Sequence, residues 1–155
     1  MQSKRIISAL TVSAALAGLV VGTAGEAGAY PQVNLCGSSY GSLKQYPIVD
    51  DHNGRRVGWI DTYYSSSTGK NCAIARGDDT QAKDFSKITV SIKTTSQSGW
   101  AQEDGELQYY TKYAGPVYVY APGSTCIDVY GFFFYRNGDD EVLSRANGGG
   151  TGLRC

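Results

Sequence analysis

Apolar and polar residues alternate in several short stretches of the chain, most clearly between Lys87 and Thr95. In this stretch Ile88, Val90 and Ile92 are separated by polar residues, which is the period of two expected of a half-buried β-strand. The pattern therefore predicts a strand with these three side chains inward and its polar side chains outward.

Further short apolar stretches predict strands over 43–49, 56–64, 71–76, 107–113, 116–121, 126–135 and 141–145. Turn sequences separate them, including the Asn-Gly pair within Asp50–Gly54 and the Pro-Gly pair at Pro122. The polar segment 77–86 predicts a loop or a single helical turn, and the glycine-rich segment 147–152 predicts an extended loop leading to Cys155. About seven short strands without a helical stripe indicate an all-β protein, either an antiparallel β-sandwich or a partly closed barrel.

The alternation also assigns side chains to faces of the predicted sheet. Three sets are expected on the core side: Val57, Trp59 and Tyr63; Cys72 and Ile74; Val117 and Val119. In the stretch 126–135 the odd-numbered apolar residues from Ile127 to Phe133 lie on one face, and Tyr130, Phe132 and Phe134 lie on the other. A strand that is apolar on both faces is typical of the centre of a fold, so this strand is expected to be central.

The first residues have the composition of an export signal. Lys4 and Arg5 precede an apolar run over 6–21, and the sequence Ala27-Gly28-Ala29 fits the small-residue rule for signal peptidase. We expect residues 1–29 to be removed and residues 30–155 to form a single secreted domain. A membrane anchor is the alternative, but polar residues interrupt the run, which is short for a bilayer span.

Charge excludes two classes of partner for the mature chain. The whole chain has 14 basic and 14 acidic side chains; removal of Lys4, Arg5 and Glu26 leaves 12 against 13, a net charge of −1. So balanced a surface gives no electrostatic footprint for nucleic acid or for an anionic membrane.

All four cysteines, Cys36, Cys72, Cys126 and Cys155, lie in the expected mature part. An exported chain meets oxidising conditions, so they predict two disulfides, and four cysteines allow three pairings. We favour the sequential pairing of Cys36 with Cys72 and of Cys126 with Cys155, because the second bond would fix the glycine-rich tail. A zinc site is disfavoured by the single histidine and the lack of a C-x-x-C motif, and no other metal or cofactor is expected.

Three groups of polar residues contain side chains that can take part in catalysis or metal binding. Each group is better explained as part of a solvent-exposed turn. His52 follows Asp50-Asp51, yet it lies in a predicted turn and no G-x-S-x-G motif accompanies it. Glu103, Asp104 and Glu106 are neighbours in a turn, where the separation of a glycosidase carboxylate pair is rarely met. Asp78-Asp79 and Asp139-Asp140-Glu141 lack the calcium-loop pattern. We therefore expect no enzyme activity.

The aromatic content is the strongest hint of a binding function. Twelve tyrosines and two tryptophans exceed what one small core needs, and the strand patterns place Tyr64, Tyr110, Tyr118 and Tyr120 away from the core. Exposed aromatic side chains can stack on sugar rings or contact a partner protein. The alternative is that a second sheet covers these tyrosines and makes them ordinary packing.

Two sequence blocks, Thr62–Ile74 and Tyr113–Ile127, together with the segment around Trp100, resemble the spore-associated protein A family of small secreted actinomycete proteins. The resemblance implies export and association with the spore or cell surface, and it brings no catalytic residues. The sequence thus predicts a secreted, non-enzymatic surface or spore-associated protein. The alternative is an extracellular module that binds cell-wall or spore-surface polysaccharide, or a secreted protein, through the four tyrosines.

Overall fold

The computed structural model describes residues 32–78, 83–106, 110, 112–137 and 144–155. The expected signal peptide, Asp79 and the acidic group at 139–141 lie outside the described residues. Among those described, no helix has the length and apolar character that crossing a membrane requires.

The described chain forms one antiparallel sheet, in the order β5-β4-β7-β8-β1-β2-β3-β6. Its eight strands are β1 (Gly41–Asp50), β2 (Arg56–Ser65), β3 (Lys70–Gly77), β4 (Lys83–Thr94), β5 (Gln102–Asp104), β6 (Tyr113–Tyr120), β7 (Ile127–Asn137) and β8 (Ser144–Leu153). The predicted all-β, antiparallel class is confirmed, with slightly more strands than the sequence indicated.

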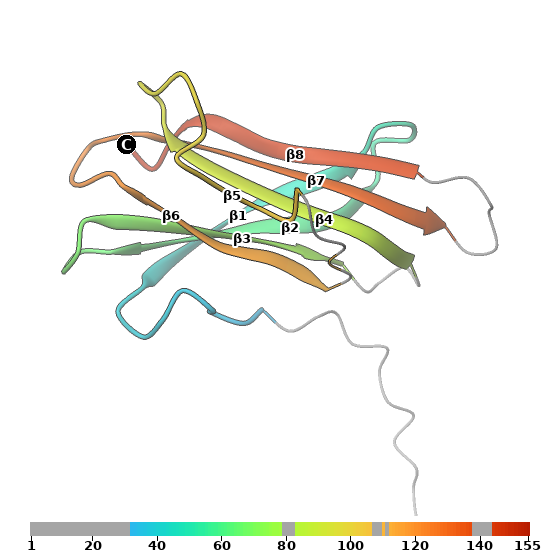
Figure 1. The fold of residues 1–155 in the computed structure, drawn as a ribbon, viewed down its shortest axis with the longest axis horizontal. Helices are drawn as coiled ribbons and strands as arrows, with labels where there is room; N and C mark the ends of the chain where they lie inside the picture. Colours follow the sequence, from blue (N-terminus) through green and yellow to red (C-terminus); the bar gives the residue numbers. More distant parts are fainter. Residues whose placement is uncertain (1–31, 79–82, 107–109, 111, 138–143) are drawn as a thin grey trace, which may run out of the picture.

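The sheet curls so that β4, β7 and β8 form one layer over β6, β3 and β2 (Figure 1). Its two edge strands, β5 and β6, meet through side chains rather than through a backbone ladder. The Tyr118 amide donates to Gln102 Oε1 at 2.6 Å, and the Gly115 amide donates to Asp104 Oδ2 at 2.7 Å. The fold is therefore a nearly closed barrel, in which these two bonds satisfy edge amides that would otherwise face solvent.

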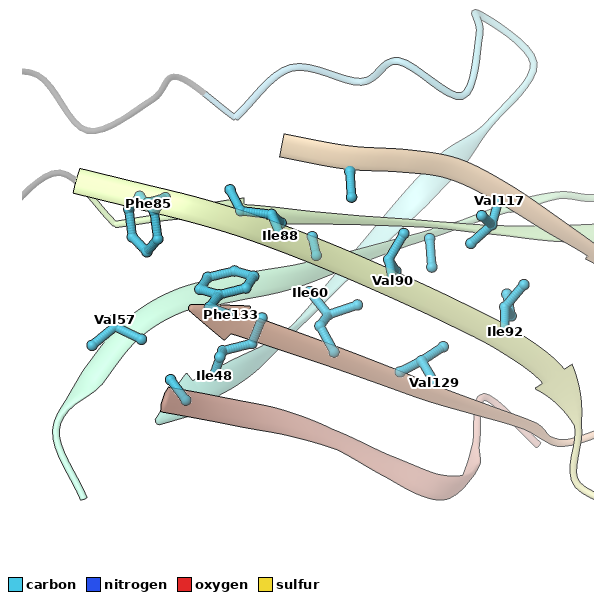
Figure 2. Close-up of a cluster of buried hydrophobic side chains, with 14 of the residues drawn as sticks. Ile48, Val57, Ile60, Phe85, Ile88, Val90, Ile92, Val117, Val129 and Phe133 are labelled. Atoms are coloured by element: carbon cyan, nitrogen blue, oxygen red, sulfur yellow. The ribbon is translucent and has the colours of Figure 1, made fainter. Parts of the chain in front are cut away.

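The main core lies between the two layers and is built from alanines, branched aliphatic side chains and the rings of Phe85 and Phe133 (Figure 2). Ile88, Val90 and Ile92 of β4 are fully buried, as the alternation predicts. β4 pairs with β7, whose Phe133 packs edge-on against Phe85 with ring centroids 5.3 Å apart. The position of β7 between β4 and β8 confirms that this strand is central.

A second, smaller cluster lies on the outer face of β2, β3 and β6, and it corrects the predicted faces. It contains Cys36, Tyr63, Cys72 and Ile74, whereas Ile60 and Ala73 face the main core. The prediction that Val57, Trp59 and Tyr63 share the core face is therefore wrong, as is the prediction of a core-side first disulfide. A register shift opposite Ile48 and Val49 breaks the alternation at the start of β2.

Within the segment 77–86, the predicted loop or helical turn is wrong for residues 83–86, because β4 already begins at Lys83, while residues 79–82 lie outside the described residues. The register of β4 with β7 shifts between Phe85 and Lys87, which leaves Ser86 as an extra residue. This bulge lets Phe85 and Ile88 both face the core although they are three positions apart. The sequence pattern missed this part of the strand because a period of two does not survive a bulge.

The glycine-rich segment 147–152 is part of β8 and not the predicted loop. β8 lies between β7 and β1, and its glycines let the three strands approach closely. A Cβ atom on Gly148 would lie 2.1 Å from the Pro47 carbonyl oxygen, and one on Gly149 would lie 2.1 Å from that of Val129. These glycines thus permit strand pairing in β8 where the sequence suggested flexibility.

The two disulfides join Cys36 to Cys72 and Cys126 to Cys155, which is the sequential pairing. The second bond fixes the end of the chain after β8. The guanidinium of Arg154 adds to this attachment by donating to Thr62 Oγ1 at 2.9 Å and to the Thr62 carbonyl at 2.7 Å.

Two further strand predictions lie largely outside the described residues. Of the predicted strand 107–113, the structure describes Tyr110 and Lys112 outside any strand and begins β6 at Tyr113. Of the predicted strand 141–145, it describes Ser144 and Arg145, which belong to β8.

Candidate functional site

The outer face of β4, β7 and β8 carries a pair of exposed aromatic rings. Trp100 and Tyr130 are each 39% exposed. Their ring centroids are 6.4 Å apart and their planes differ by 24°. The two side chains therefore present a common apolar surface to solvent. This surface and the two hollows beside it, described below, are together called the aromatic groove.

Tyr130 faces outward because its neighbours on β7 face the core. Val129 is buried, and Gly131 lies so close to β1 and β2 that a Cβ atom would come within 2.9 Å of Ile48 Cδ1 and 3.0 Å of Ile60 Cγ1. Phe132 and Phe134, the next outward residues, are half-buried and pack edge to face at 4.7 Å. The outer face of β7 is thus an aromatic stripe that continues away from Tyr130.

Trp100 is positioned by the loop that follows β4. The Thr94 amide donates to Gln97 Oε1 at 2.8 Å, and the Ala101 amide returns the chain to the sheet by donating to the Ile92 carbonyl at 2.9 Å. Lys93 Nζ lies 5.3 Å from the centre of the Trp100 ring, within the range of a cation–π interaction. Lys93 of β4 therefore contacts the Trp100 ring, which remains 39% exposed.

Asp128 holds Lys93 in this place. Its Oδ1 accepts hydrogen bonds from Thr95 Oγ1 at 2.6 Å and from the Gly152 amide at 3.0 Å, and its Oδ2 lies 3.6 Å from Lys93 Nζ. Burial by itself raises the pKa of this carboxyl group, but the two hydrogen bonds and the Lys93 ammonium outweigh it and lower the pKa below the ordinary value. Asp128 is thus held ionised beneath the groove.

Two hollows adjoin the aromatic pair, and Trp100 and Tyr130 line both. The first has a volume of about 470 Å³ and extends over β8, where Gly148, Gly149 and Gly150 form its floor. The second has a volume of about 260 Å³ and lies between β4 and β5, lined also by Phe132, Ser91 and Glu103. Ser91 Oγ donates to Glu103 Oε1 at 3.1 Å, so the second hollow offers polar atoms beside its aromatic wall.

The four tyrosines expected to bind are not gathered on one face. Tyr120 is the most exposed at 64%, and Tyr118 is half-buried in the second cluster, 5.6 Å from the ring of Tyr40. Tyr110 packs against the main core, and Tyr64 pairs with Asn71, which in turn pairs with the core residue Val119. The prediction that all four point away from the core is therefore wrong for Tyr110 and Tyr64.

The candidate catalytic and metal residues lie in a turn, in an ion pair and in β5, so the predicted turn is wrong for Glu103 and Asp104. His52 is exposed in the β1–β2 turn, and its amide donates to Asp50 Oδ1 at 2.7 Å. Asp104 accepts from the Gly115 amide and from Tyr110 Oη, and Asp78 pairs with Arg56 at 2.8 Å. Among residues 32–78, 83–106, 110, 112–137 and 144–155, no three metal-ligating side chains form a group.

Comparisons with known proteins give the family. The fold and the site define a small, disulfide-bonded all-β protein with an exposed aromatic groove. The chain is 34% identical over 119 residues to spore-associated protein A of Streptomyces coelicolor, an alignment that covers 77% of this chain and 67% of that protein. The chain belongs to the spore-associated protein A family. No family model matches the chain, and no solved structure matches it.

Proposed function

We propose that the protein is an exported, non-enzymatic binding module of the spore or cell surface that holds polysaccharide through its aromatic groove. The carrying observation is the pair of exposed rings of Trp100 and Tyr130, which line both hollows. Export rests on the signal sequence expected over residues 1–29, and the surface location rests on the name of the Streptomyces relative.

Sugar rings match this surface in two ways. A pyranose ring presents an apolar face of C–H groups, which covers an aromatic ring favourably, and hydroxyl groups around its edge, which need hydrogen-bonding partners. Beside the rings the groove offers Lys93, Ser91 and Glu103 as such partners. An aromatic platform next to polar atoms therefore supports recognition of a polysaccharide.

The groove is also prepared before any ligand arrives. Lys93 and the bonds of Gln97 hold Trp100 in place, and Asp128 holds Lys93. Because little side-chain freedom remains to be lost on binding, weak stacking contacts can contribute a larger share of the affinity.

The test is retention of the protein on insoluble chitin, cellulose and peptidoglycan, followed by titration on the polymer that retains it. We expect Trp100→Ala to weaken binding about tenfold or more and Tyr130→Ala to weaken it less, because each removes a stacking ring. Tyr120→Ala is the matched control, since Tyr120 is 64% exposed and lies on β6 outside the groove.

Other outcomes contradict the proposal in distinct ways. Loss of binding in Tyr118→Ala and Tyr120→Ala, with Trp100→Ala unaffected, would place the site on the tyrosines of β6 instead. Failure of all three polymers to retain the protein, combined with cross-linking of Trp100 to a secreted protein, would favour a protein partner. Surface location is tested separately, by fractionation of cells and spores that express the full chain with a tag.

A further inference from the structure

We infer that the aromatic groove binds an internal stretch of a polysaccharide chain, with sugar subsites on both sides of Trp100, rather than a single sugar at a chain end. This inference rests on the proposed function and specifies the ligand of the same site. The observation that carries it is that Trp100 and Tyr130 are common to two separate hollows.

The first subsite lies over β8 and has a floor without side chains. Gly148 and Gly149 cannot be replaced by a larger residue without displacing the backbone of Pro47 or Val129, because a Cβ atom would lie 2.1 Å from their carbonyl oxygens. Close strand pairing therefore keeps this part of the outer surface low. Asn147 and Thr151, which flank these glycines in β8, also line the hollow, so polar side chains lie beside the low glycine surface where a ligand chain would pass.

The second subsite lies on the opposite side of the aromatic pair, between β4 and β5. Phe132 extends the aromatic stripe of β7 into it, and the bonded pair of Ser91 and Glu103 lies at its side. A sugar ring in this subsite would stack on Phe132 and Tyr130 and exchange hydrogen bonds with the polar pair. The aromatic surface thus runs through both hollows and does not end at Trp100.

The charged groups of the two subsites disfavour an acidic polymer. Lys93 is paired with Asp128 in the first subsite, whereas Glu103, Asp104 and Glu106 outnumber Lys87 in the second. An anionic sugar would be repelled by this acidic excess, while hydroxyl or amide groups can donate hydrogen bonds to the carboxylates. The class of ligand is therefore a neutral polysaccharide of pyranose units, recognised along its length.

The experiment is a titration of the purified protein with soluble oligomers of N-acetylglucosamine and of glucose, from two to six units, with the intact polymers in parallel. Each oligomer is used as such and after borohydride reduction of its terminal sugar. We expect affinity to rise at least tenfold from the disaccharide to the longer oligomers of the preferred series and to be unchanged by reduction of the end.

Phe132→Ala separates the two subsites. It removes stacking from the second subsite and leaves the first, so we expect the hexamer to bind this variant about as weakly as a short oligomer binds the parent protein. Tyr120→Ala is the control, because Tyr120 is an exposed ring of β6 that lines neither hollow. Circular dichroism of both variants verifies that the barrel is intact.

The inference is overturned if the disaccharide and the hexamer bind equally, or if reduction of the terminal sugar abolishes binding, because either result describes a chain-end site. Retention on an insoluble polymer without binding of its hexamer also overturns it, since the protein would then recognise a packed polymer surface. In these cases the proposed function stands. If neither oligomers nor polymers bind, the proposed function itself fails.

Discussion

Asp128 connects the aromatic groove with the end of the chain. Its carboxylate is bonded to Thr95, next to the Trp100 loop, and to the amide of Gly152, just before the Cys126–Cys155 bond. Lys93 completes the contact from β4. One buried charge with three partners therefore joins β4, β7 and the end of β8, so a change at this residue should affect both stability and binding.

Replacement of Asp128 by asparagine should make the free energy of unfolding depend less on pH in the acid range. The pKa of Asp128 is lowered in the folded state, so the ionised form stabilises the fold above the unfolded pKa, and this stabilisation is lost as pH falls through the lowered folded pKa. At pH 7 we expect Asp128→Asn to lower the free energy of unfolding by about 1–2 kcal/mol relative to the parent protein. The difference should shrink as the pH falls below about 3.9, the ordinary pKa of an aspartate.

Urea unfolding at a series of pH values measures this difference. If the free energy of unfolding differs by the same amount for the two proteins at every pH, Asp128 contributes through the shape of its side chain and not through its charge. A Trp100 fluorescence change in Asp128→Asn, in a Trp59→Phe background, would report whether Lys93 still supports the ring.

Strand β7 shows at the level of an element how one sequence serves both packing and binding. Phe133 is fully buried, while its neighbour Phe132 is half-buried and lines the second hollow. We expect Phe133→Ala to lower the free energy of unfolding by about 3–5 kcal/mol and Phe132→Ala to lower it by much less. Binding of polysaccharide should show the opposite order.

Denaturant titrations of the two alanine variants, with binding measured under native conditions, test this division. Equal losses of stability would mean that the outer face of β7 is covered as tightly as the inner face. In that case the side chains of the aromatic stripe would serve packing and not binding, which is the alternative that the sequence left open for the tyrosines.

The sequence predicted the strands that keep a strict alternation and missed those that do not. The alternation in β4 gave the inward side chains from Ile88 to Ile92 correctly. It failed at the bulge of Ser86, and it failed in β8, where the reason for the glycines is contact with Pro47 and Val129. Contacts between strands distant in the sequence decide both features, and a single strand pattern does not contain them.

The candidate site was only partly accessible to sequence reasoning. The pattern correctly placed Tyr130 and Phe132 on the face opposite Val129 and Phe133, but a strand that is apolar on both faces indicated burial on both. Trp100 lies in a loop without periodicity, and its proximity to Tyr130 depends on the fold of the 95–101 loop over the sheet. Exposure of the outer face therefore had to come from the structure.

At the scale of the molecule, two cross-links of different accessibility stabilise a small barrel. Cys36 and Cys72 are buried under the second cluster, at 6% and 0% exposure, whereas Cys155 is exposed at the end of the chain. Each bond closes a loop, of 36 and 29 residues respectively. Loss of either should lower the free energy of unfolding by about 3–4 kcal/mol.

Accessibility predicts the order in which the bonds are reduced. A thiol reductant must reach a sulfur atom, so under native conditions Cys126–Cys155 should open first and Cys36–Cys72 only when the second cluster opens. Graded reduction, alkylation and peptide mapping give the order. The first intermediate should stay folded, because Arg154 still bonds Thr62 and β8 still pairs with β7 and β1. Simultaneous alkylation of all four cysteines would instead show that opening the exposed bond unfolds the whole barrel.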